Sequence, residues 1–443
     1  MRFLYVFLWF AFHYSFRLYF RRIKIINPSN YFFGRTIFVS NHQGSFMDPL
    51  IIASQRSPIV FFMTRSDVFN KYTNPLLWSV HMLPIYRQRD GVDTKEKNAK
   101  IFEKTNEVLK SKRNILIFGE GFTDDRIQRR LHPIKKGAAR IGFSALEYCD
   151  WNEDIYLQGL GVNYTDFNQR GSDVLIAAGS EIKLNDFKEA YIDNPSKTIT
   201  EVTRLLEVNM RTLVTDVHDP FWADVHEDIM MFTRKGLHPI CFNNELSIEA
   251  RWLYSKKLGD WLNSCNSEEL DQLIPLTNKI QEYKKKLLSQ GITENERYLF
   301  MNKQWNVPGT LFKMVLIAPM ALLGFIHAGL PYYLTKNWVE KKFKRSVFWG
   351  STKKVLVLFL TIFLNLPLLL IIPRFLPFDF LVNVVIGCVY FLLIGLYAQA
   401  FLILRKYIKH CLRWNSLKQI NLEPLHQLHK LILDEINQRI PVQ

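Results

Sequence analysis

The chain contains the stretch Thr36-Ile37-Phe38-Val39-Ser40-Asn41-His42-Gln43-Gly44-Ser45-Phe46-Met47-Asp48. Its first residues are mainly β-branched or aromatic, which is typical of a buried β-strand. His42 and Asp48 follow directly, where the C-terminal end of that strand would lie. In α/β proteins this end of a strand commonly carries the functional site. The stretch therefore predicts an α/β fold with a polar site at the end of a buried strand.

The pairing of His42 with Asp48 is typical of general base catalysis. A neutral imidazole accepts the proton of a hydroxyl group, and a carboxylate at the other ring nitrogen fixes the tautomer and stabilises the imidazolium. The pair favours attack of a hydroxyl oxygen on an acyl thioester, which needs no metal. The alternative is a structural histidine in a loop, whose ring forms a hydrogen bond with a nearby carboxylate. Such spacings of His and Asp also arise by chance.

Three later segments extend this pattern in chain order. They are Met82–Arg87, Asn114–Asp125 and Leu157–Tyr164. The first is a short apolar strand that ends in an arginine, the second is a strand that runs into Glu120 between two glycines, and the third is a strand that carries glycines. An acid between two glycines at a strand end is not typical of a core position. We therefore expect the four segments to meet at one site.

Together the four segments resemble the sequence blocks of the glycerolipid acyltransferase superfamily, whose members make lysophosphatidate and phosphatidate. The resemblance covers roughly residues 30–185. It implies a glycerolphosphate-acyltransferase-like α/β domain with a mostly parallel sheet. It also implies that His42 is the base, that Asp48 orients it, and that Glu120 holds the acceptor or braces the site. No cofactor is implied, since acyl-CoA or acyl-carrier protein is the acyl-donor substrate.

The chain departs from the family pattern at two places. Most members have four residues between the His and the Asp, whereas the five residues Gln43–Met47 stand here. This longer spacing looks like the branch that acylates glycerol 3-phosphate or dihydroxyacetone phosphate. The family also often has Thr-Arg after the Glu-Gly pair, whereas Phe122 and Thr123 follow Gly121 here. A phosphate-binding arginine expected at position 123 is therefore missing.

Other cations are candidates to bind the acceptor phosphate, which arginine forks or lysine ammonium groups hold best. Arg87 ends the second block, where the family places a phosphate contact. Five more cations follow the third block: Arg126, Arg129, Arg130, Lys135 and Lys136. For these five residues an alternative stays open, in which they form a solvated charged surface and bind no substrate. The expected substrate-binding residues are Arg87, Glu120, Gly121, Lys135, Lys136, Ser45 and Arg126, while Asp124 and Asp125 are expected to cap the next turn.

Composition favours a protein at a membrane. The 443 residues are 48% hydrophobic and 14% aromatic, and the formal net charge is +16. Such a charge suits anionic lipid and phosphorylated substrates. We expect no nucleic-acid partner, because no helix-turn-helix, finger or single-strand-binding signature accompanies the charge. The five cysteines lie far apart, which favours unpaired thiols in a reducing compartment and no metal site.

The first 190 residues divide into two expected parts. Residues 1–29 are aromatic and basic, with no acidic residue before Asp48, and predict an interfacial amphipathic helix. They lack the small-residue cleavage site of a signal peptide, and a single-pass anchor is the alternative. Residues 30–190 alternate between strand and helix patterns and form the expected catalytic domain.

Residues 191–305 predict a helical extension. Six of its side chains cluster in a way that raises the question of a metal: Asp216, His218, Asp224, His226, Glu227 and Asp228. None of them has the spacing of a known ligand set, such as His-Glu-x-x-His. We therefore expect a solvated acidic surface rather than a metal site.

Residues 306–414 form the expected membrane region. Val355–Ile372 and Phe380–Leu404 are long enough to cross about 30 Å of hydrocarbon, and Pro373–Asp379 would join them as a helical hairpin. Thr310–Leu334 contains two prolines and a lysine, so we expect a re-entrant or interfacial segment broken at its prolines. Residues 415–443 predict an amphipathic C-terminal helix.

The distribution of positive charge predicts the orientation of the hairpin. Cytoplasmic flanks are rich in Lys and Arg. Only Arg374 lies in the turn, whereas many cations lie at the two outer ends: Lys336, Lys341, Lys342, Lys344, Arg345, Lys353 and Lys354 before it, and Arg405, Lys406, Lys409 and Arg413 after it. Both ends should therefore be cytoplasmic, and the catalytic domain should face the cytoplasm, at the inner membrane if the chain is bacterial.

The sequence thus predicts a membrane-bound acyltransferase that serves phospholipid synthesis. Its expected partners are membrane lipids, acyl-CoA or acyl-carrier protein, and a glycerol phosphate acceptor. The choice between glycerol 3-phosphate and its 1-acyl form stays open. Two alternatives also stay open: an acyltransferase for another lipid acceptor, such as a lysophospholipid or an aminolipid, and a non-catalytic membrane scaffold.

Overall fold

The computed structural model describes residues 2–27, 34–55, 60–86, 94–302, 307–417 and 421–442. A seven-stranded sheet organises the first part of the chain, in the order β1-β7-β6-β2-β5-β3-β4. Its strands are β1 (Arg22–Ile26), β2 (Thr36–Ser40), β3 (Val60–Arg65), β4 (Met82–Ile85), β5 (Asn114–Phe118), β6 (Tyr156–Tyr164) and β7 (Asp173–Lys183). All neighbouring pairs are parallel except β6 and β7. The predicted mostly parallel α/β sheet is confirmed.

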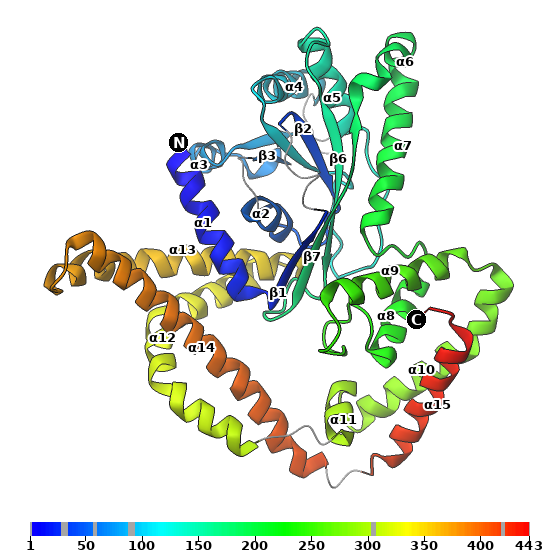
Figure 1. Cartoon of the computed structure of the whole chain (residues 1–443), viewed down its shortest axis with the longest axis vertical. Helices are drawn as coiled ribbons and strands as arrows, with labels where there is room; N and C mark the ends of the chain where they lie inside the picture. The colour runs from blue at the N-terminus through cyan, green and yellow to red at the C-terminus, as the bar shows by residue number, and fades with distance from the viewer. Residues whose placement is uncertain are drawn as a thin grey trace.

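Strand β2 lies at the centre of the sheet and is buried on both faces (Figure 1). Ile37 and Val39 join a core with the helices α4 (Thr94–Lys110), α5 (Gly137–Tyr148) and α7 (Pro195–Leu213). Phe38 points to the opposite face, because side chains alternate along a strand, and joins a core with α1 (Arg2–Tyr19), α2 (Met47–Ser54) and the membrane region. Each fully buried side chain of this kind contributes about 1.5–3 kcal/mol. The strand that precedes His42 is thus firmly fixed.

The N-terminal helix α1 packs against the catalytic domain with one aromatic face. Tyr5, Phe12 and Phe16 are buried, whereas Phe7 and Phe10 are about half exposed on the other side. The chain then continues into β1, which pairs with β7 at the sheet edge. This strand lies within residues 1–29, for which we expected an interfacial helix. Its basic residues resemble a membrane-surface segment, and only the pairing with β7 identifies it as a strand.

The helical extension forms a second core. The short α6 (Lys188–Asp193) and the longer α7 come first in the chain. The core itself contains α8 (Pro220–Thr233), α9 (Ile248–Ser264), α10 (Ser267–Ser289) and α11 (Glu294–Met301). The C-terminal helix α15 (Glu423–Arg439) returns to this core, where Ile432 and Ile436 are buried beside residues of α8 and α10. Lys279 of α10 also pairs with Glu435 of α15 at 2.7 Å. Segments before and after the membrane region therefore form one folded body.

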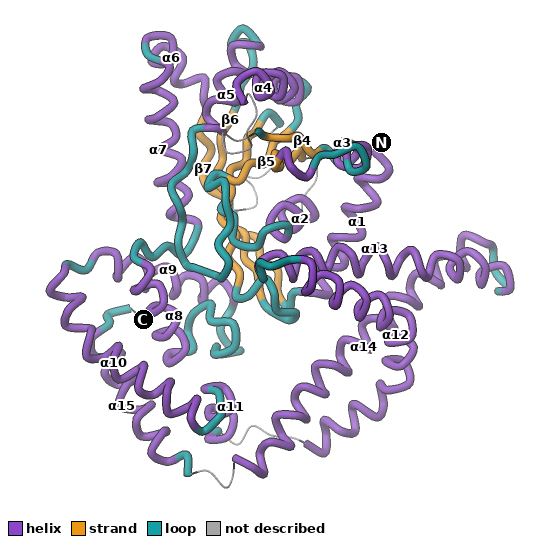
Figure 2. The backbone as a smooth tube through the Cα atoms, turned by 180° about the vertical axis from the view of Figure 1, so that it is seen from behind, coloured by secondary structure: helices purple, strands orange, loops and turns teal. Residues whose placement is uncertain are grey.

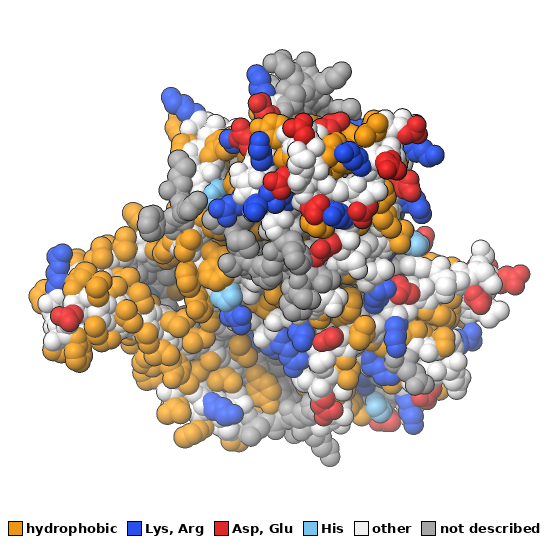
Figure 3. Space-filling model, turned by 45° about the horizontal axis from the view of Figure 1, so that its top comes forward, with side chains coloured by type: hydrophobic (Ala, Val, Ile, Leu, Met, Phe, Trp, Pro, Cys, Tyr) orange, Lys and Arg blue, Asp and Glu red, His pale blue; other side chains and the backbone are white. Residues whose placement is uncertain are grey.

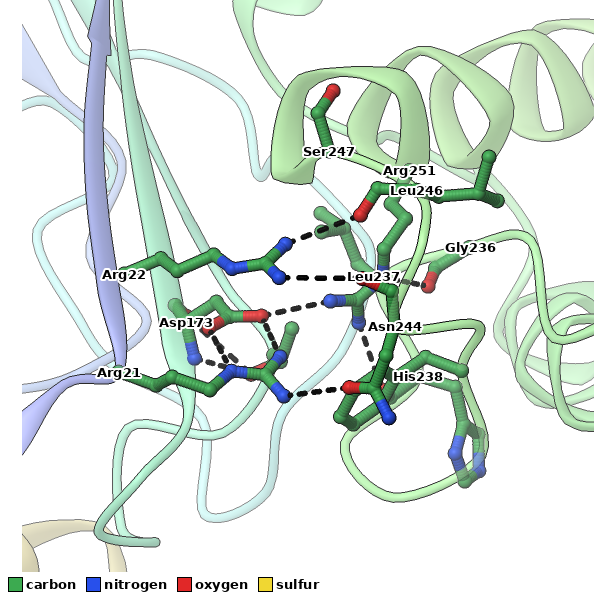
Figure 4. A network of polar contacts seen from close by, with 12 residues as sticks. Arg21, Arg22, Asp173, Gly236, Leu237, His238, Asn244, Leu246, Ser247 and Arg251 are labelled. Carbon is green, nitrogen blue, oxygen red and sulfur yellow. Dashed lines mark hydrogen bonds and ion pairs between the residues drawn. The ribbon is translucent and has the colours of Figure 1, made fainter.

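Asp173 at the start of β7 joins the sheet to the helical extension (Figure 4). Its carboxylate is fully buried and accepts hydrogen bonds from Nε of Arg21 at 2.9 Å and from Nη1 of Arg251 at 2.7 Å. Arg22 donates to the carbonyl of Leu246 at 3.1 Å. Breaking a buried ion pair by removing one partner costs about 3–5 kcal/mol. This network fixes α9 against the edge of the catalytic domain.

We expected a solvated acidic surface on α8 and on the segment before it. This prediction is wrong for three of the six residues. Asp216, His226 and Asp228 are buried. Asp216 accepts a hydrogen bond from the backbone N–H of Leu131 at 2.7 Å, and Asp228 pairs with Lys284 at 2.7 Å. Within the described ranges, no group of three or more His, Cys, Asp or Glu side chains is placed to hold a metal ion.

The membrane region consists of α12 (Val307–Lys342), α13 (Val347–Ile371) and α14 (Phe380–Leu417). All three are long and apolar enough to cross a membrane, with Val307–Lys342, Val347–Ile371 and Phe380–Lys409 as the candidate spans. The two expected hairpin helices are present as α13 and α14. Figure 3 shows a broad hydrophobic surface on the side that carries these helices. Phe312, Phe363 and Leu381 are among its exposed side chains.

The expected break of Thr310–Leu334 at its prolines is wrong. The segment belongs to one continuous helix, α12, with Pro319 and Pro331 inside it. The helix bends instead, as Figures 1 and 2 show. A proline removes one intrahelical hydrogen bond and kinks the helix, and in apolar surroundings the other backbone groups are satisfied best if the helix continues.

The membrane region contacts the preceding folded body at two places. Between α12 and α13, Arg345 binds Asp125, and at the start of α13 the backbone N–H of Gly350 donates to Asn168 at 3.1 Å. Near the end of α14, Arg413 lies 3.3 Å from Glu296 of α11. The helix α12 therefore ends next to the sheet domain, and α14 ends next to the helical extension (Figure 2).

Candidate active site

His42 lies at the C-terminal end of β2 and contacts Asp48 through its ring. Its Nδ1 atom is 2.9 Å from Oδ2 of Asp48. The imidazole also stacks on Phe118 at the end of β5, with ring centroids 4.1 Å apart and planes at 21°. The carboxylate accepts the Nδ1 proton, which leaves Nε2 as the nitrogen that can accept a proton from a substrate. The two residues expected to form a base and its orienting group are thus in contact.

The Asp48 carboxylate is held by two further hydrogen bonds. It is fully buried, and it accepts the backbone N–H of Gly44 on Oδ2 at 2.9 Å and the hydroxyl of Tyr164 on Oδ1 at 2.8 Å. Burial, followed by the Asp48 charge, raises the pKa of Tyr164 well above its usual range. The phenol therefore stays protonated and donates. The carboxylate has one fixed orientation toward His42.

The five residues between His42 and Asp48 fold back as a compact turn. Ser45 has a φ of 53° and is buried, and the backbone N–H of Asp48 donates to its carbonyl at 3.2 Å. Helix α2 then starts at Met47, so that Asp48 lies in its first turn. A side chain at Gly44 would meet Oδ1 of Asp48 at 2.7 Å, so glycine is needed there. The longer spacing is accommodated without separating the pair.

Glu120 braces the loop that carries His42. It is 4% exposed, and its two oxygens accept the backbone N–H groups of His42 at 2.6 Å and of His132 at 3.1 Å. Burial raises the pKa of Glu120, although the two backbone hydrogen bonds act in the opposite direction. Of the two expected roles, holding the acceptor or bracing the site, this geometry favours bracing.

Gly121 and Lys135 lie together beside Glu120. Gly121 has a φ of 72°, a conformation that glycine adopts without strain, and its N–H closes a turn onto the carbonyl of Phe118 at 3.2 Å. A side chain there would lie 2.6 Å from Nζ of Lys135, so this ammonium group lies directly over the turn. The lysine side chain is exposed. It is therefore placed to meet an anion near the turn.

Three of the candidate phosphate ligands bind other partners. Lys136 donates to Thr200 of α7 at 2.7 Å, and Arg126 pairs with Asp224 of α8 at 3.3 Å. Arg129 is almost completely buried and binds Glu227 at 2.7 Å and the carbonyl of Tyr164 at 2.6 Å, so it is structural. Arg87, the first candidate, lies outside the described residues.

Asp124 and Asp125 also differ from their expected role as turn caps. Asp124 accepts from Nε2 of His132 at 2.8 Å, and Asp125 pairs with Arg345 of the membrane region. The three glycine N–H groups near the site are occupied as well: that of Gly44 by Asp48, that of Gly119 by the carbonyl of Ser40, and that of Gly121 by the carbonyl of Phe118. None of these three N–H groups is free to stabilise an oxyanion in this conformation.

An apolar pocket of about 300 Å³ opens beside the turn that carries Asp48. Phe46, Pro49 and Leu50 form the wall nearest to that turn. The other walls come from three different parts of the chain: α1, the short α3 (Asn74–Ser79) with its flanking strands, and α13. The lining side chains are nearly all apolar, as in a site for a hydrocarbon chain.

Comparison with known proteins gives one family match and a similarity to a solved structure. Residues 22–159 match the model of the family described as Acyltransferase, a range that begins at β1 and contains His42, Asp48 and Glu120. No curated protein matches the chain. Among solved structures, the 1-acyl-sn-glycerophosphate (LPA) acyltransferase PlsC from Thermotoga maritima is similar, with 15% sequence identity and a TM-score of 0.33 over 46% of this chain and 80% of that chain. The family match supports acyl transfer as the class of reaction.

Sequence reasoning missed two residues that hold the site together. Tyr164 was taken only as the end of a strand, and Asn41 only as the residue before the histidine. The Asn41 side chain exchanges two hydrogen bonds with the backbone of Val162, at 2.8 and 3.0 Å, and so fixes the end of β2 to β6. A polar residue directly after a strand that was predicted to be buried, and next to His42, was the signal available for Asn41. No local signal identifies the partner of Tyr164.

Proposed function

We propose that this chain transfers a fatty acyl group from acyl-CoA or acyl-carrier protein to a hydroxyl of glycerol 3-phosphate or 1-acylglycerol 3-phosphate. The observation that carries the proposal is the buried Asp48 carboxylate, which three hydrogen bonds hold beside His42. A loop histidine that merely lay near an acid would not need a fully buried partner that Gly44 holds within the turn and Tyr164 holds from a distant strand. The match to the Acyltransferase family over residues 22–159 supports the same reaction.

The reaction needs one base and no covalent enzyme intermediate. Nε2 of His42 takes the proton of the acceptor hydroxyl as the oxygen attacks the thioester carbonyl carbon. The carbon–sulfur bond then breaks, and the leaving thiolate takes the proton from the imidazolium. Asp48 stabilises this imidazolium while it exists. A positioned base of this kind contributes about 10²–10⁴ in rate.

The acyl chain of the donor is proposed to occupy the apolar pocket beside α2. The pocket wall at Phe46 and Pro49 flanks Asp48, so a chain lying there would have its carbonyl end near His42. The two helices that form one wall, α1 and α13, also carry exposed apolar side chains, among them Phe7 and Phe363. A hydrocarbon chain could therefore reach the pocket from a membrane without crossing water.

The membrane region is proposed to be anchored from one side of the bilayer. Because Arg345 and Arg413 both contact the folded body that precedes α12, a straight crossing by α12 would separate parts that are in contact. We therefore infer that α12 is a bent, membrane-embedded helix whose ends lie on the same side, and that α13 and α14 form a hairpin. The distribution of positive charge favours the cytoplasm for that side, which is where the thioester donors would be.

An acceptor panel tests the proposal. Purified protein in phospholipid nanodiscs is given acyl-CoA or acyl-carrier protein with glycerol 3-phosphate, 1-acylglycerol 3-phosphate, a lysophospholipid or an aminolipid, and free thiol and acylated product are measured. Product from one of the two glycerol phosphates supports the proposal. Product from the other acceptors alone would assign a different lipid substrate, and no thiol release with any acceptor would favour a scaffold.

A further inference from the structure

The turn after β5 is covered by a segment from the membrane region. This segment, residues 343–346, links α12 to α13. Arg345 donates from Nη2 to the carbonyl of Thr123 and from Nε to Oδ1 of Asp125, both at 2.5 Å. Ser346 donates to the carbonyl of Asp125 at 3.3 Å. An arginine that lies 222 residues after Thr123 and 220 residues after Asp125 is thus part of the surroundings of this turn.

The same segment lies close to the catalytic pair. Phe348, at the start of α13, contacts Phe46 with ring centroids 6.3 Å apart, and Phe46 lies two residues before Asp48. On the other side, Thr123 lies three residues after Glu120, whose carboxylate holds the backbone N–H of His42. The guanidinium group therefore lies on the turn after β5, and Phe348, three residues further along the chain, contacts the loop between His42 and Asp48.

The charges at this turn suit a phosphate. Lys135 lies over Gly121, and Arg345 lies at Thr123 and Asp125, so two cations from different parts of the chain flank one turn. Lys136 and Arg126, which the sequence favoured for this role, bind Thr200 and Asp224 instead.

The contact between Arg345 and Asp125 leaves the arginine available to a ligand. Both side chains are substantially exposed, 43% and 68%, and ion pairs as exposed as this contribute little to stability. A phosphate monoester accepts charge-assisted hydrogen bonds that are stronger than such a pair. Arg345 also has five N–H donors, of which the two contacts use only part. An incoming phosphate can therefore replace Asp125 as the partner of Arg345.

We propose that Arg345 binds the phosphate of the acceptor and supplies, from the membrane region, the arginine that is absent at position 123. This inference rests on the proposed function, because it assumes a phosphorylated acceptor. Its consequence is that the acceptor site is complete only when the segment between α12 and α13 lies against the catalytic domain. The acceptor would then be bound at the junction between the membrane region and the sheet.

Steady-state kinetics of the full-length protein in nanodiscs test this role. Arg345→Ala should raise KM for the phosphorylated acceptor about tenfold while KM for acyl-CoA stays within twofold, because one charge-assisted contact to the acceptor is lost. Arg345→Lys should give an intermediate KM, since it keeps the charge and loses the fork. Lys344→Ala, which changes the exposed neighbouring cation, is the matched control and should match the wild type.

Asp125→Asn separates phosphate binding from a purely structural contact. If Arg345 only fastens the membrane region to the turn, Asp125→Asn and Arg345→Ala break the same ion pair and should change the kinetics in the same direction. If Arg345 binds phosphate, Asp125→Asn removes a competing carboxylate and should lower KM for the acceptor. Equal and parallel effects of the two variants, or an unchanged acceptor KM in Arg345→Ala, would overturn the inference.

The wild-type protein distinguishes this failure from failure of the proposed function. If the wild type acylates a glycerol phosphate and Arg345→Ala does so with an unchanged acceptor KM, only the role of Arg345 is wrong. If the wild type acylates no phosphorylated acceptor, the proposed function is wrong and the inference falls with it.

Discussion

The hydroxyl group of Tyr164 on β6 donates a hydrogen bond to Oδ1 of Asp48 on α2 at 2.8 Å. The two residues are 116 positions apart in the chain. Because Oδ2 of Asp48 contacts His42, the tyrosine fixes the carboxylate from the side opposite to the imidazole. His42, Asp48 and this phenol therefore form a continuous chain of contacts from the sheet to the candidate site.

Tyr164→Phe should lower kcat about tenfold and leave both KM values nearly unchanged. The substitution keeps the aromatic ring but leaves one oxygen of a buried carboxylate without a partner, and hydrogen bonds to charged groups contribute about 1.5–3 kcal/mol. The measurement is steady-state thiol release, with Tyr148→Phe at an exposed position as the control. An unchanged kcat would mean that Gly44 alone holds Asp48.

Glu120→Gln should lower both stability and kcat, although the two side chains have the same shape. Glu120 accepts two backbone N–H groups, whereas a glutamine offers one acceptor oxygen and would direct an N–H group at the other donor. We expect a loss of about 1–3 kcal/mol and a lower melting temperature. Thermal unfolding beside the exposed control Glu103→Gln tests this, and a melting temperature equal to the wild type's would contradict the bracing role.

His429 of α15 should make the protein less stable in acid. Burial lowers the pKa of His429 to about 4, from an ordinary value of 6.5. Between these values the unfolded chain binds more protons than the folded one, so stability falls as the pH is lowered from about 6.5 toward 4. His429→Phe, which keeps a ring beside Phe232, should show a smaller loss of melting temperature between pH 7 and pH 5. The exposed control His218→Phe should lose as much as the wild type.

Single cysteines should report the orientation of the membrane region in intact cells. In a variant whose five native cysteines are replaced by serine, a cysteine at Asp379 should react with an impermeant thiol reagent added outside. Cysteines at Lys342 and at Glu189 of the catalytic domain should react only after the membrane is opened. Labelling of Glu189 from outside, with protection at Lys342, would show that α12 crosses the bilayer and would contradict the proposed orientation.

Local sequence patterns predicted those parts of the site that are close in the chain. The apolar run of Ile37, Phe38 and Val39 and the polar residues that follow located β2 and the loop of His42, because a central strand has both faces buried and its end is open. Asp48 is six residues from His42, so their contact depends on one turn and the first turn of α2. The strands β5 and β6 were found for the same reason as β2.

Contacts between distant segments were not predictable from one sequence. The partner of Tyr164 depends on the pairing of β6 with β2, and the position of Arg345 depends on how the membrane region docks. Conversely, Lys136 and Arg126 have the charge that a phosphate needs, but the helices α7 and α8 offer them other partners. Asp216, taken as a solvated acid, is buried because the helical extension covers it.

The central claim is that His42 is the base for acyl transfer and that Asp48 orients it. The most direct measurement is turnover by His42→Ala and Asp48→Asn in nanodiscs, beside His218→Ala and Asp271→Asn, which change exposed residues of the helical extension. Both site variants should remain folded and membrane-bound and lose at least ~10²-fold in kcat, and the two controls should match the wild type. Near-normal turnover by both site variants would contradict the account.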